Sequence, residues 1–301
     1  MKKLIIYLIY GAVCLVLGAG LVVSTQSPAR PDLSVWHLTE LESEVTAEDI
    51  RHMPDLSDYR EREDALFREL DKKIYDKGPV QGPVMFNRYR KGAWSDPGRF
   101  SVNWNRTFEL PVDHPRMAVL MLHGLSDSPY SLKALAQGLH RQNMHVVGLR
   151  LPGHGTIPAG LAHVHWQDFT EAVRLAARDL RQKTGGQCPL VLVGYSNGAT
   201  LAVEYTLAQM SGEDLPRPSG LILISPALAV SPMAALARWN MRLSNVPGLE
   251  KLGWLSIEPE FDPFKYNSFS DQNNWLFIRS IFRVPFQNIK CRRVDTSFVH
   301  C

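Results

Sequence analysis

The feature that most constrains this 301-residue chain is a short apolar run that leads into Gly194-Tyr195-Ser196-Asn197-Gly198 and then into a helical pattern. A serine projects its hydroxyl above a sheet where a strand passes into a helix through a tight, strained turn. Side chains two positions before and after that serine would collide with neighbouring chains, and glycine at 194 and 198 removes them. The helix that follows directs the positive end of its dipole at the turn. The sequence therefore predicts a nucleophilic serine, Ser196, on a sharp strand-to-helix turn.

Four short apolar runs determine the expected class of fold. They occupy residues 117–122, 145–151, 190–193 and 221–224. One helix is predicted to start at Ser128-Pro129, and another runs from Trp166 to Gln182 and ends at Gly185-Gly186. Continuous apolar strands that alternate with amphipathic helices are typical of a parallel sheet covered on both faces. The expected class is therefore α/β, with a mostly parallel sheet and helices on both of its faces.

The strand over 117–122 ends in His123-Gly124-Leu125, which suggests how Ser196 is assisted. An oxyanion hole needs two backbone N–H groups that converge on one substrate oxygen. One comes from the residue after the nucleophile, here Asn197, and the other comes from the loop after the earlier strand, here Leu125. His123 adjoins the glycine, so we expect it to make structural hydrogen bonds and to take no part in catalysis.

Three motifs follow one another along the chain: His123-Gly124, Arg150-Leu-Pro-Gly-His154-Gly155 and Gly194-x-Ser196-x-Gly198. In this order they resemble the α/β-hydrolase superfamily, in particular its bacterial carboxylesterases and its monoacylglycerol-lipase-like and serine-aminopeptidase-like hydrolases. The resemblance covers about residues 115–226. It implies an α/β-hydrolase fold with Ser196 as nucleophile, no cofactor, and a structural role for the loop that holds His154. It does not identify a substrate.

Residues 227–270 occupy the position of this family's helical cap and carry many apolar side chains. A cap of this kind would line a pocket for an acyl chain or a lipid. The alternative is that these side chains only cover the core.

The partners of Ser196 are the missing part of the pattern. The serine needs a base to take its proton and an acid to orient that base, and in this superfamily the acid precedes the histidine. The histidine that follows Ser196 is His300, and the nearest acid before it is Asp295. Five positions cannot supply the helix and strand that should separate them, so Asp295 and His300 do not fit these roles. Asp262 and Asp271 are no better placed, and the catalytic acid and histidine stay unassigned.

The tail beyond Lys290 shows neither a clean strand pattern nor a helical one. We therefore expect the chain to be truncated by a frameshift near Lys290, so that the hydrolase domain is incomplete and lacks its last strands. An open sheet edge pairs readily with other chains, so poor solubility or poor activity would follow.

A membrane segment is expected at the start of the chain, over residues 1–23. Leu4 to Val23 form a run without a charge, and a helix of that length reaches about 30 Å, the thickness of a bilayer core. Lys2 and Lys3 precede it, which places the catalytic domain on the extracytoplasmic, periplasmic side of a single-pass anchor. The alternative is a cleaved signal peptide and a secreted protein, although signal cores are usually shorter, about 7–15 residues.

Residues 24–99 are expected to form a linker and a helical appendage. Ser, Pro and Ala dominate residues 24–35, and apolar side chains recur at helical spacing over Tyr59–Lys73. The alternative is a plain spacer between membrane and enzyme. The hydrolase domain is expected over residues 100–301, and it opens with a strand or hairpin over Phe100–Leu110.

Composition narrows the function further. The net charge of +3 without a dense Lys/Arg stripe argues against nucleic acid as a partner. The chain has no H-E-x-x-H motif and no phosphate-binding or dinucleotide motif, and its four cysteines lack metal-ligand spacing, so no metal is expected. The leading hypothesis is a membrane-anchored serine hydrolase that cleaves carboxyl esters or lipid esters through an acyl-enzyme on Ser196. The alternative is a catalytically inactive, membrane-bound, hydrolase-like module that binds a lipid or a partner.

Overall fold

A computed structural model of the chain describes residues 31–77, 84–227 and 242–270 apart from 245, together with isolated positions before residue 19. Most of the expected anchor over residues 1–23 lies outside the described residues, and so do Asp271, Asp295, His300 and the tail from Lys290. Among the helices of the described residues, none has the length and apolar character needed to cross a bilayer.

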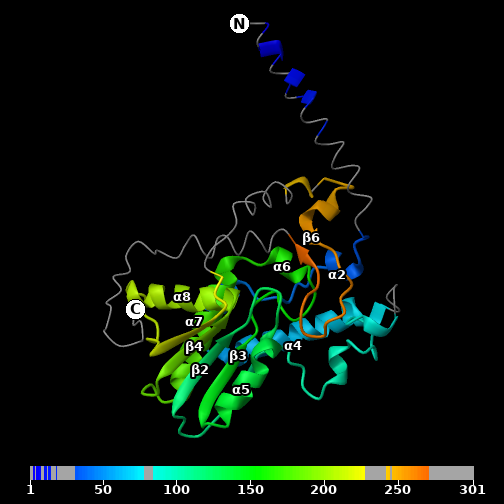
Figure 1. The fold of residues 1–301 in the computed structure, drawn as a ribbon. Helices are drawn as coiled ribbons and strands as arrows, with labels where there is room; N and C mark the ends of the chain where they lie inside the picture. The colour runs from blue at the N-terminus through cyan, green and yellow to red at the C-terminus, as the bar shows by residue number, and fades with distance from the viewer. Residues whose placement is uncertain are drawn as a thin grey trace.

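The centre of the molecule is a five-stranded sheet. Its strands are β1 (Phe108–Leu110), β2 (Met117–Leu122), β3 (Met144–Leu149), β4 (Leu190–Tyr195) and β5 (Gly220–Ile224). They lie in the order β1-β3-β2-β4-β5, and all neighbours are parallel except the antiparallel pair β1 and β3 (Figure 1). Each of the four predicted apolar runs is a strand, which confirms the mostly parallel α/β sheet.

The register of this sheet gathers three loops at one edge. Leu122, the last residue of β2, is paired with Leu149 on one side and with Gly194 on the other. The loops that follow β2, β3 and β4 therefore leave the sheet side by side. All three sequence motifs lie at these strand ends.

Helices cover both faces of the sheet, as expected. Those flanking it are α5 (Lys133–His140), α7 (Trp166–Lys183) and α8 (Asn197–Met210). Along β2 the side chains alternate: Leu120 belongs to the core formed with α7 and α8, whereas Val119 belongs to the cluster that includes Ala136 of α5. This alternation is what a strand buried on both faces requires.

Two sequence predictions are wrong in detail. The predicted strand over Phe100–Leu110 pairs only at Phe108–Leu110, because the preceding residues form turns in which Trp104 packs edge-on against Phe108, with ring centroids 5.2 Å apart. The helix expected to begin at Ser128-Pro129 starts as a 3-10 turn, η5 (Pro129–Leu132), and α5 follows it.

The N-terminal helical segment, residues 35–73, packs against the sheet domain. Its helices are α2 (Val35–Leu38), α3 (Ala47–Arg51) and α4 (Leu56–Lys73). Ile50, Leu56 and Tyr59 are fully buried in the same core as β2 and α7. This segment is therefore built into the core beside the sheet.

Short elements complete the described chain. They are η2 (Tyr75–Lys77), η3 (Val84–Phe86), η4 (Pro97–Arg99), α6 (Gly160–His163), η7 (Glu250–Gly253), β6 (Trp254–Ser256) and β7 (Phe269–Ser270). Of the helical cap expected over residues 227–270, residues 228–241 and 245 lie outside the described residues, and the described part contains η7 and the antiparallel pair β6 and β7. Figure 1 shows β6 close to α2.

Candidate active site

Ser196 lies on the turn between β4 and α8, in agreement with the sequence motif. Its φ of 53° and ψ of −113° fall in a region that residues with a side chain rarely adopt, at a cost of about 1–3 kcal/mol. The Ser196 N–H donates to the Ile224 carbonyl at 2.9 Å, and the Ser196 carbonyl accepts the N–H of Ala199 at 3.1 Å. Backbone hydrogen bonds to β5 and α8 therefore hold the strained turn.

Gly194 and Gly198 avoid the steric clashes that the motif predicts for any larger residue. A Cβ at Gly198 would lie 2.1 Å from the Leu122 carbonyl oxygen, and a Cβ at Gly194 would lie 2.4 Å from the Ala199 nitrogen. Both obstacles are backbone atoms, which cannot swing aside as a flexible side chain does. The turn is therefore open only to glycine at both positions.

Ser196 faces a cavity of about 210 Å³ that it shares with the loop after β2. The lining residues are Gly124, Leu125, Ser126, Asp127, Tyr195, Ser196, Lys265 and Phe269. The structure thus brings Ser196 and Leu125 together, although they are far apart in the sequence. Asn197, the first residue of α8, is 2% exposed and adjoins the same turn.

The two amides expected to bind an oxyanion are both available. The first N–H groups of a helix have no acceptor within the helix, and the Asn197 N–H donates to no other described residue. The same holds for the Leu125 N–H among the described residues. Each is therefore free to donate to a substrate oxygen.

Asp127 and Lys265 are cavity residues that the sequence did not reveal. The Lys265 ammonium lies 3.7 Å from the Asp127 carboxylate, and burial raises the pKa of Asp127 although Lys265 opposes that rise. Asp127 looked like part of a helix start, and Lys265 is more than a hundred residues away in the expected cap. No local pattern joins such a pair, because only the fold brings them together.

His123 has the structural role that its position suggested. The Leu151 N–H donates to Nε2 of His123 at 3.1 Å, so the imidazole proton sits on Nδ1, which donates to the Gly124 carbonyl at 2.9 Å. The ring is fully buried, and this burial holds its pKa well below the usual value. Both ring nitrogens are committed to backbone groups.

His154 is also buried and engaged with backbone. Its Nε2 lies 2.8 Å from the Leu125 carbonyl oxygen, and its Nδ1 lies 2.9 Å from the Pro152 carbonyl oxygen. Burial lowers the pKa of His154 to about 4, so the ring is neutral at pH 7 and donates one N–H. His154 thus lies between the loop after β3 and the loop after β2, within hydrogen-bond distance of a carbonyl oxygen of each.

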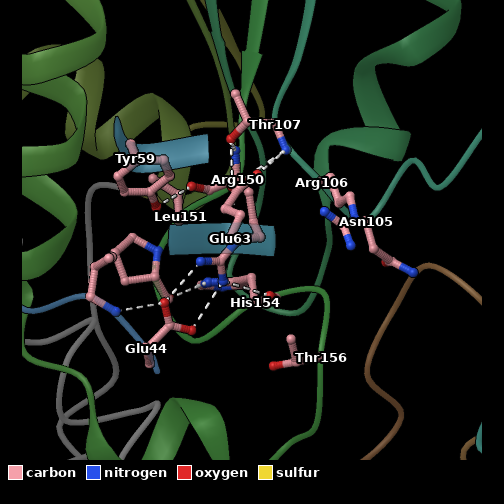
Figure 2. A network of polar contacts seen from close by, with 12 residues as sticks. Glu44, Tyr59, Glu63, Asn105, Arg106, Thr107, Arg150, Leu151, His154 and Thr156 are labelled. Atoms are coloured by element: carbon pink, nitrogen blue, oxygen red, sulfur yellow. Dashed lines mark hydrogen bonds and ion pairs between the residues drawn. The ribbon is translucent and has the colours of Figure 1, made fainter. Parts of the chain in front are cut away.

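Behind these loops lies a buried ionic network centred on Arg150 (Figure 2). Arg150 is fully buried, and its guanidinium makes a two-point contact with Glu44 at 2.8 and 3.0 Å and donates from Nε to Glu63 at 3.0 Å. Thr107 donates its hydroxyl to Glu63 at 2.6 Å. Sequence reasoning missed this network. Its one signal was a charged residue, Arg150, at the end of an apolar strand.

No histidine partner for Ser196 is found among the described residues. No histidine in that part of the chain lines the Ser196 cavity, and Asp262 is likewise absent from its lining. Asp262 instead accepts the N–H of Phe264 at 2.8 Å. Nor do the described residues contain a group of three or more His, Cys, Asp or Glu side chains arranged to hold a metal ion.

A larger groove of about 820 Å³ lies elsewhere, against α2 and β6. Its walls include Trp36, Phe86, Trp254 and Phe261, and none of the predicted site residues is among them. Size alone would favour this groove as the site. The nucleophile turn and the two free amides place the chemistry at the smaller cavity.

Comparison with known proteins agrees with this geometry. A model of the serine aminopeptidase S33 family of hydrolases matches residues 113–259. The chain is 29% identical over 193 residues to the phospholipase YtpA of Bacillus subtilis (strain 168). This match covers 62% of this chain and 71% of that protein.

Among solved structures, one of the metagenome-derived lipolytic enzymes LipS and LipT is 26% identical, with a TM-score of 0.47 over 60% of this chain and 69% of its own. The monoacylglycerol lipase of Paleococcus ferrophilus is 22% identical, with a TM-score of 0.43 over 59% of this chain and 70% of its own. The three motifs, the sheet order and the two sequence matches are all consistent with a member of the α/β-hydrolase superfamily, and they support an enzyme of the hydrolase class.

Proposed function

We propose that the chain hydrolyses carboxylic esters, lipid esters among them, through an acyl-enzyme on Ser196. The observation that carries this proposal is the strained turn at Ser196, which shares a cavity with the free amide of Leu125 and adjoins that of Asn197. The similarity to a Bacillus subtilis phospholipase supports a lipid ester as the substrate class. Serine, amides and cavity form a site for acyl transfer.

The reaction runs in two halves. A base takes the proton of the Ser196 hydroxyl while Oγ attacks the ester carbonyl carbon, and the carbonyl oxygen becomes an oxyanion that accepts N–H bonds from Leu125 and Asn197. The tetrahedral intermediate collapses, the alcohol leaves with that proton, and water then hydrolyses the acyl-serine ester. His123 and His154 are committed to backbone groups, so the base is a residue other than these two.

The alternative function is a catalytically inactive module that binds a lipid or a partner. The observation in its favour is that no histidine among the described residues lines the Ser196 cavity. Without a base the serine hydroxyl is a weak nucleophile, and the cavity would then only bind.

A fluorophosphonate probe separates the two functions, because it phosphonylates an activated serine hydroxyl. We expect the full chain to be labelled and the variant Ser196→Ala to be inert. Ser211→Ala is the matched control, since Ser211 is exposed at the far end of the same helix and should leave labelling unchanged. A well-folded parent protein that takes no label would favour the binding module. A chain-length series of p-nitrophenyl esters then defines the acyl preference.

We also propose that residues 4–23 attach the enzyme to a membrane, with the hydrolase domain on the extracytoplasmic side. The uncharged apolar run and the two lysines before it support this proposal. The protein should stay with membranes through an alkaline carbonate wash and be digested by protease added to spheroplasts. Recovery in the soluble fraction with a new N-terminus after residue 23 would instead indicate signal cleavage.

A further inference from the structure

Glu44 is a nearly buried carboxylate outside the region that matches the hydrolase family. It lies between α2 and α3, its side chain is 14% exposed, and the family match begins only at residue 113. Its two oxygens accept from Nη1 and Nη2 of Arg150, and Oε2 also accepts the N–H of Gly153 at 2.8 Å. One side chain therefore holds both the start and the middle of the loop after β3.

Arg150 extends this hold to the end of the loop. Its Nη1 donates to the His154 carbonyl at 3.0 Å, so the residues from Arg150 to His154 are closed into a compact loop around one guanidinium (Figure 2). Glycine suits position 153 in this loop, because its φ is 76° and a Cβ there would lie 3.0 Å from the Gly160 carbonyl oxygen. A buried guanidinium with two carboxylates supplies charge-assisted hydrogen bonds, which are the stronger kind.

Two histidines connect this loop to the loop after β2, which contains Leu125. Leu151 donates its N–H to His123, and His123 donates to the Gly124 carbonyl. That carbonyl belongs to the same planar trans peptide as the Leu125 N–H, so fixing the C=O on one side aims the N–H to the other. His154 contacts the next carbonyl, that of Leu125, at 2.8 Å. The Gly124 carbonyl thus lies against His123, which Leu151 of the loop after β3 contacts, and the Leu125 carbonyl lies against His154 of that same loop.

From this chain of contacts we propose that Glu44 is a positioning residue for the oxyanion amide of Leu125. It acts through Arg150 and Gly153 on the loop after β3, and through His123 and His154 on Leu125. The N-terminal helical segment is then a working part of the active site. The inference rests on the proposed function of Ser196, because Leu125 needs aiming only if an oxyanion forms there.

Kinetics of matched variants tests this role. Glu44→Gln keeps the shape of the side chain but places an amide N–H against the N–H donors of Arg150 and Gly153. We expect kcat and the rate of fluorophosphonate labelling to fall about tenfold, less than the loss of a whole oxyanion donor, with KM changed less than about twofold. Glu44→Asp keeps the charge and should recover part of the rate. Glu42→Gln, an exposed position that pairs with Lys73, should match the parent protein.

Hydrogen exchange gives a second measurement that needs no turnover. In Glu44→Gln the backbone amides of residues 123–126 should exchange about tenfold faster than in the parent, while those of β4 and α8 stay unchanged. Unchanged labelling and unchanged exchange in a folded Glu44→Gln protein would overturn the inference. If the parent itself takes no label, the proposed function fails. Faster exchange at residues 123–126 would then still show the aiming of Leu125, and unchanged exchange would refute it.

Discussion

The two sides of the Ser196 cavity are built in opposite ways. On the nucleophile side, backbone hydrogen bonds and two glycines hold the turn, and the contacts that constrain it are made by main-chain atoms, such as those of Leu122, Ala199 and Ile224. On the oxyanion side, two buried histidines and a buried arginine hold the loop, and the carboxylates that pair with Arg150 come from residues 44 and 63. The nucleophile side depends on steric fit, whereas the oxyanion side depends on the charges of Glu44 and Glu63, which are distant from Arg150 in the sequence. The two should therefore fail under different perturbations.

The largest loss of stability is expected on the nucleophile side, from Gly198→Ala. The new Cβ would meet the Leu122 carbonyl oxygen at 2.1 Å, and neither backbone can retreat without breaking the β2–β4 register. We expect a loss of more than about 4 kcal/mol in the free energy of unfolding, together with loss of fluorophosphonate labelling. Urea unfolding followed by fluorescence measures the first quantity.

Gly138→Ala is the control for this comparison. Gly138 lies within α5, where a Cβ would meet nothing nearer than Nη2 of Arg141 at 3.9 Å. Alanine should stabilise this helix by about 0.5–1 kcal/mol. If Gly198→Ala behaved like Gly138→Ala, backbone crowding would not be what restricts the nucleophile turn to glycine.

The next largest loss of stability is expected on the oxyanion side, from Arg150→Met. This change leaves Glu44 and Glu63 near each other in the interior without their cation, which costs about 3–4 kcal/mol. Burial already raises the pKa of Glu63 while Arg150 opposes that rise, so loss of the guanidinium should raise the pKa of this carboxyl further.

The triple variant Arg150→Met, Glu44→Gln, Glu63→Gln tests whether charge is the cause. Removing all three charges should recover most of the lost stability, because the unpaired carboxylates are gone. Thermal and urea unfolding of the single and triple variants decide the matter. Equal stability of the two would mean that Arg150 acts through packing alone.

This contrast also explains how much of the site could be predicted. Ser196, Gly194 and Gly198 follow from a five-residue motif, because the constraints on that turn are local and steric. The pairing of Leu125 with Ser196 follows from the order of strands and loops. That Glu44 and Glu63 partner Arg150 does not follow, because a polar, strongly charged segment has the same sequence pattern whether it is solvated or buries two carboxylates. The strand over Phe100–Leu110 failed for a related reason: Trp104 packs on Phe108 from a turn and takes no part in the ladder that begins at Phe108.

The smallest loss of stability is expected on acidification, through protonation of His154 on the oxyanion side. The pKa of His154 is about 4 in the folded protein and about 6.5 when unfolded, so between these values the unfolded chain binds a proton that the native protein does not. His154 therefore favours folding above pH 6.5 relative to acid, and this contribution is lost as the pH falls from 6.5 to 4. This difference between the folded and unfolded pKa lowers the free energy of unfolding by about 3 kcal/mol below pH 4 and by about 2 kcal/mol at pH 5.

Buried carboxyls such as Glu260 and Glu63, whose pKa values are raised, act with the opposite sign, so the pH profile of the parent alone is ambiguous. The comparison with His154→Gln removes this ambiguity, because glutamine does not titrate and the carboxyl contributions cancel between the two proteins. The parent's advantage in urea unfolding should shrink by about 2 kcal/mol between pH 7 and pH 5. The protection of the amides of residues 123–126 against hydrogen exchange, relative to their intrinsic rate at each pH, should fall in the parent before that of α8 does. A constant difference between the two proteins across this range would show that His154 does not make the oxyanion side sensitive to acid.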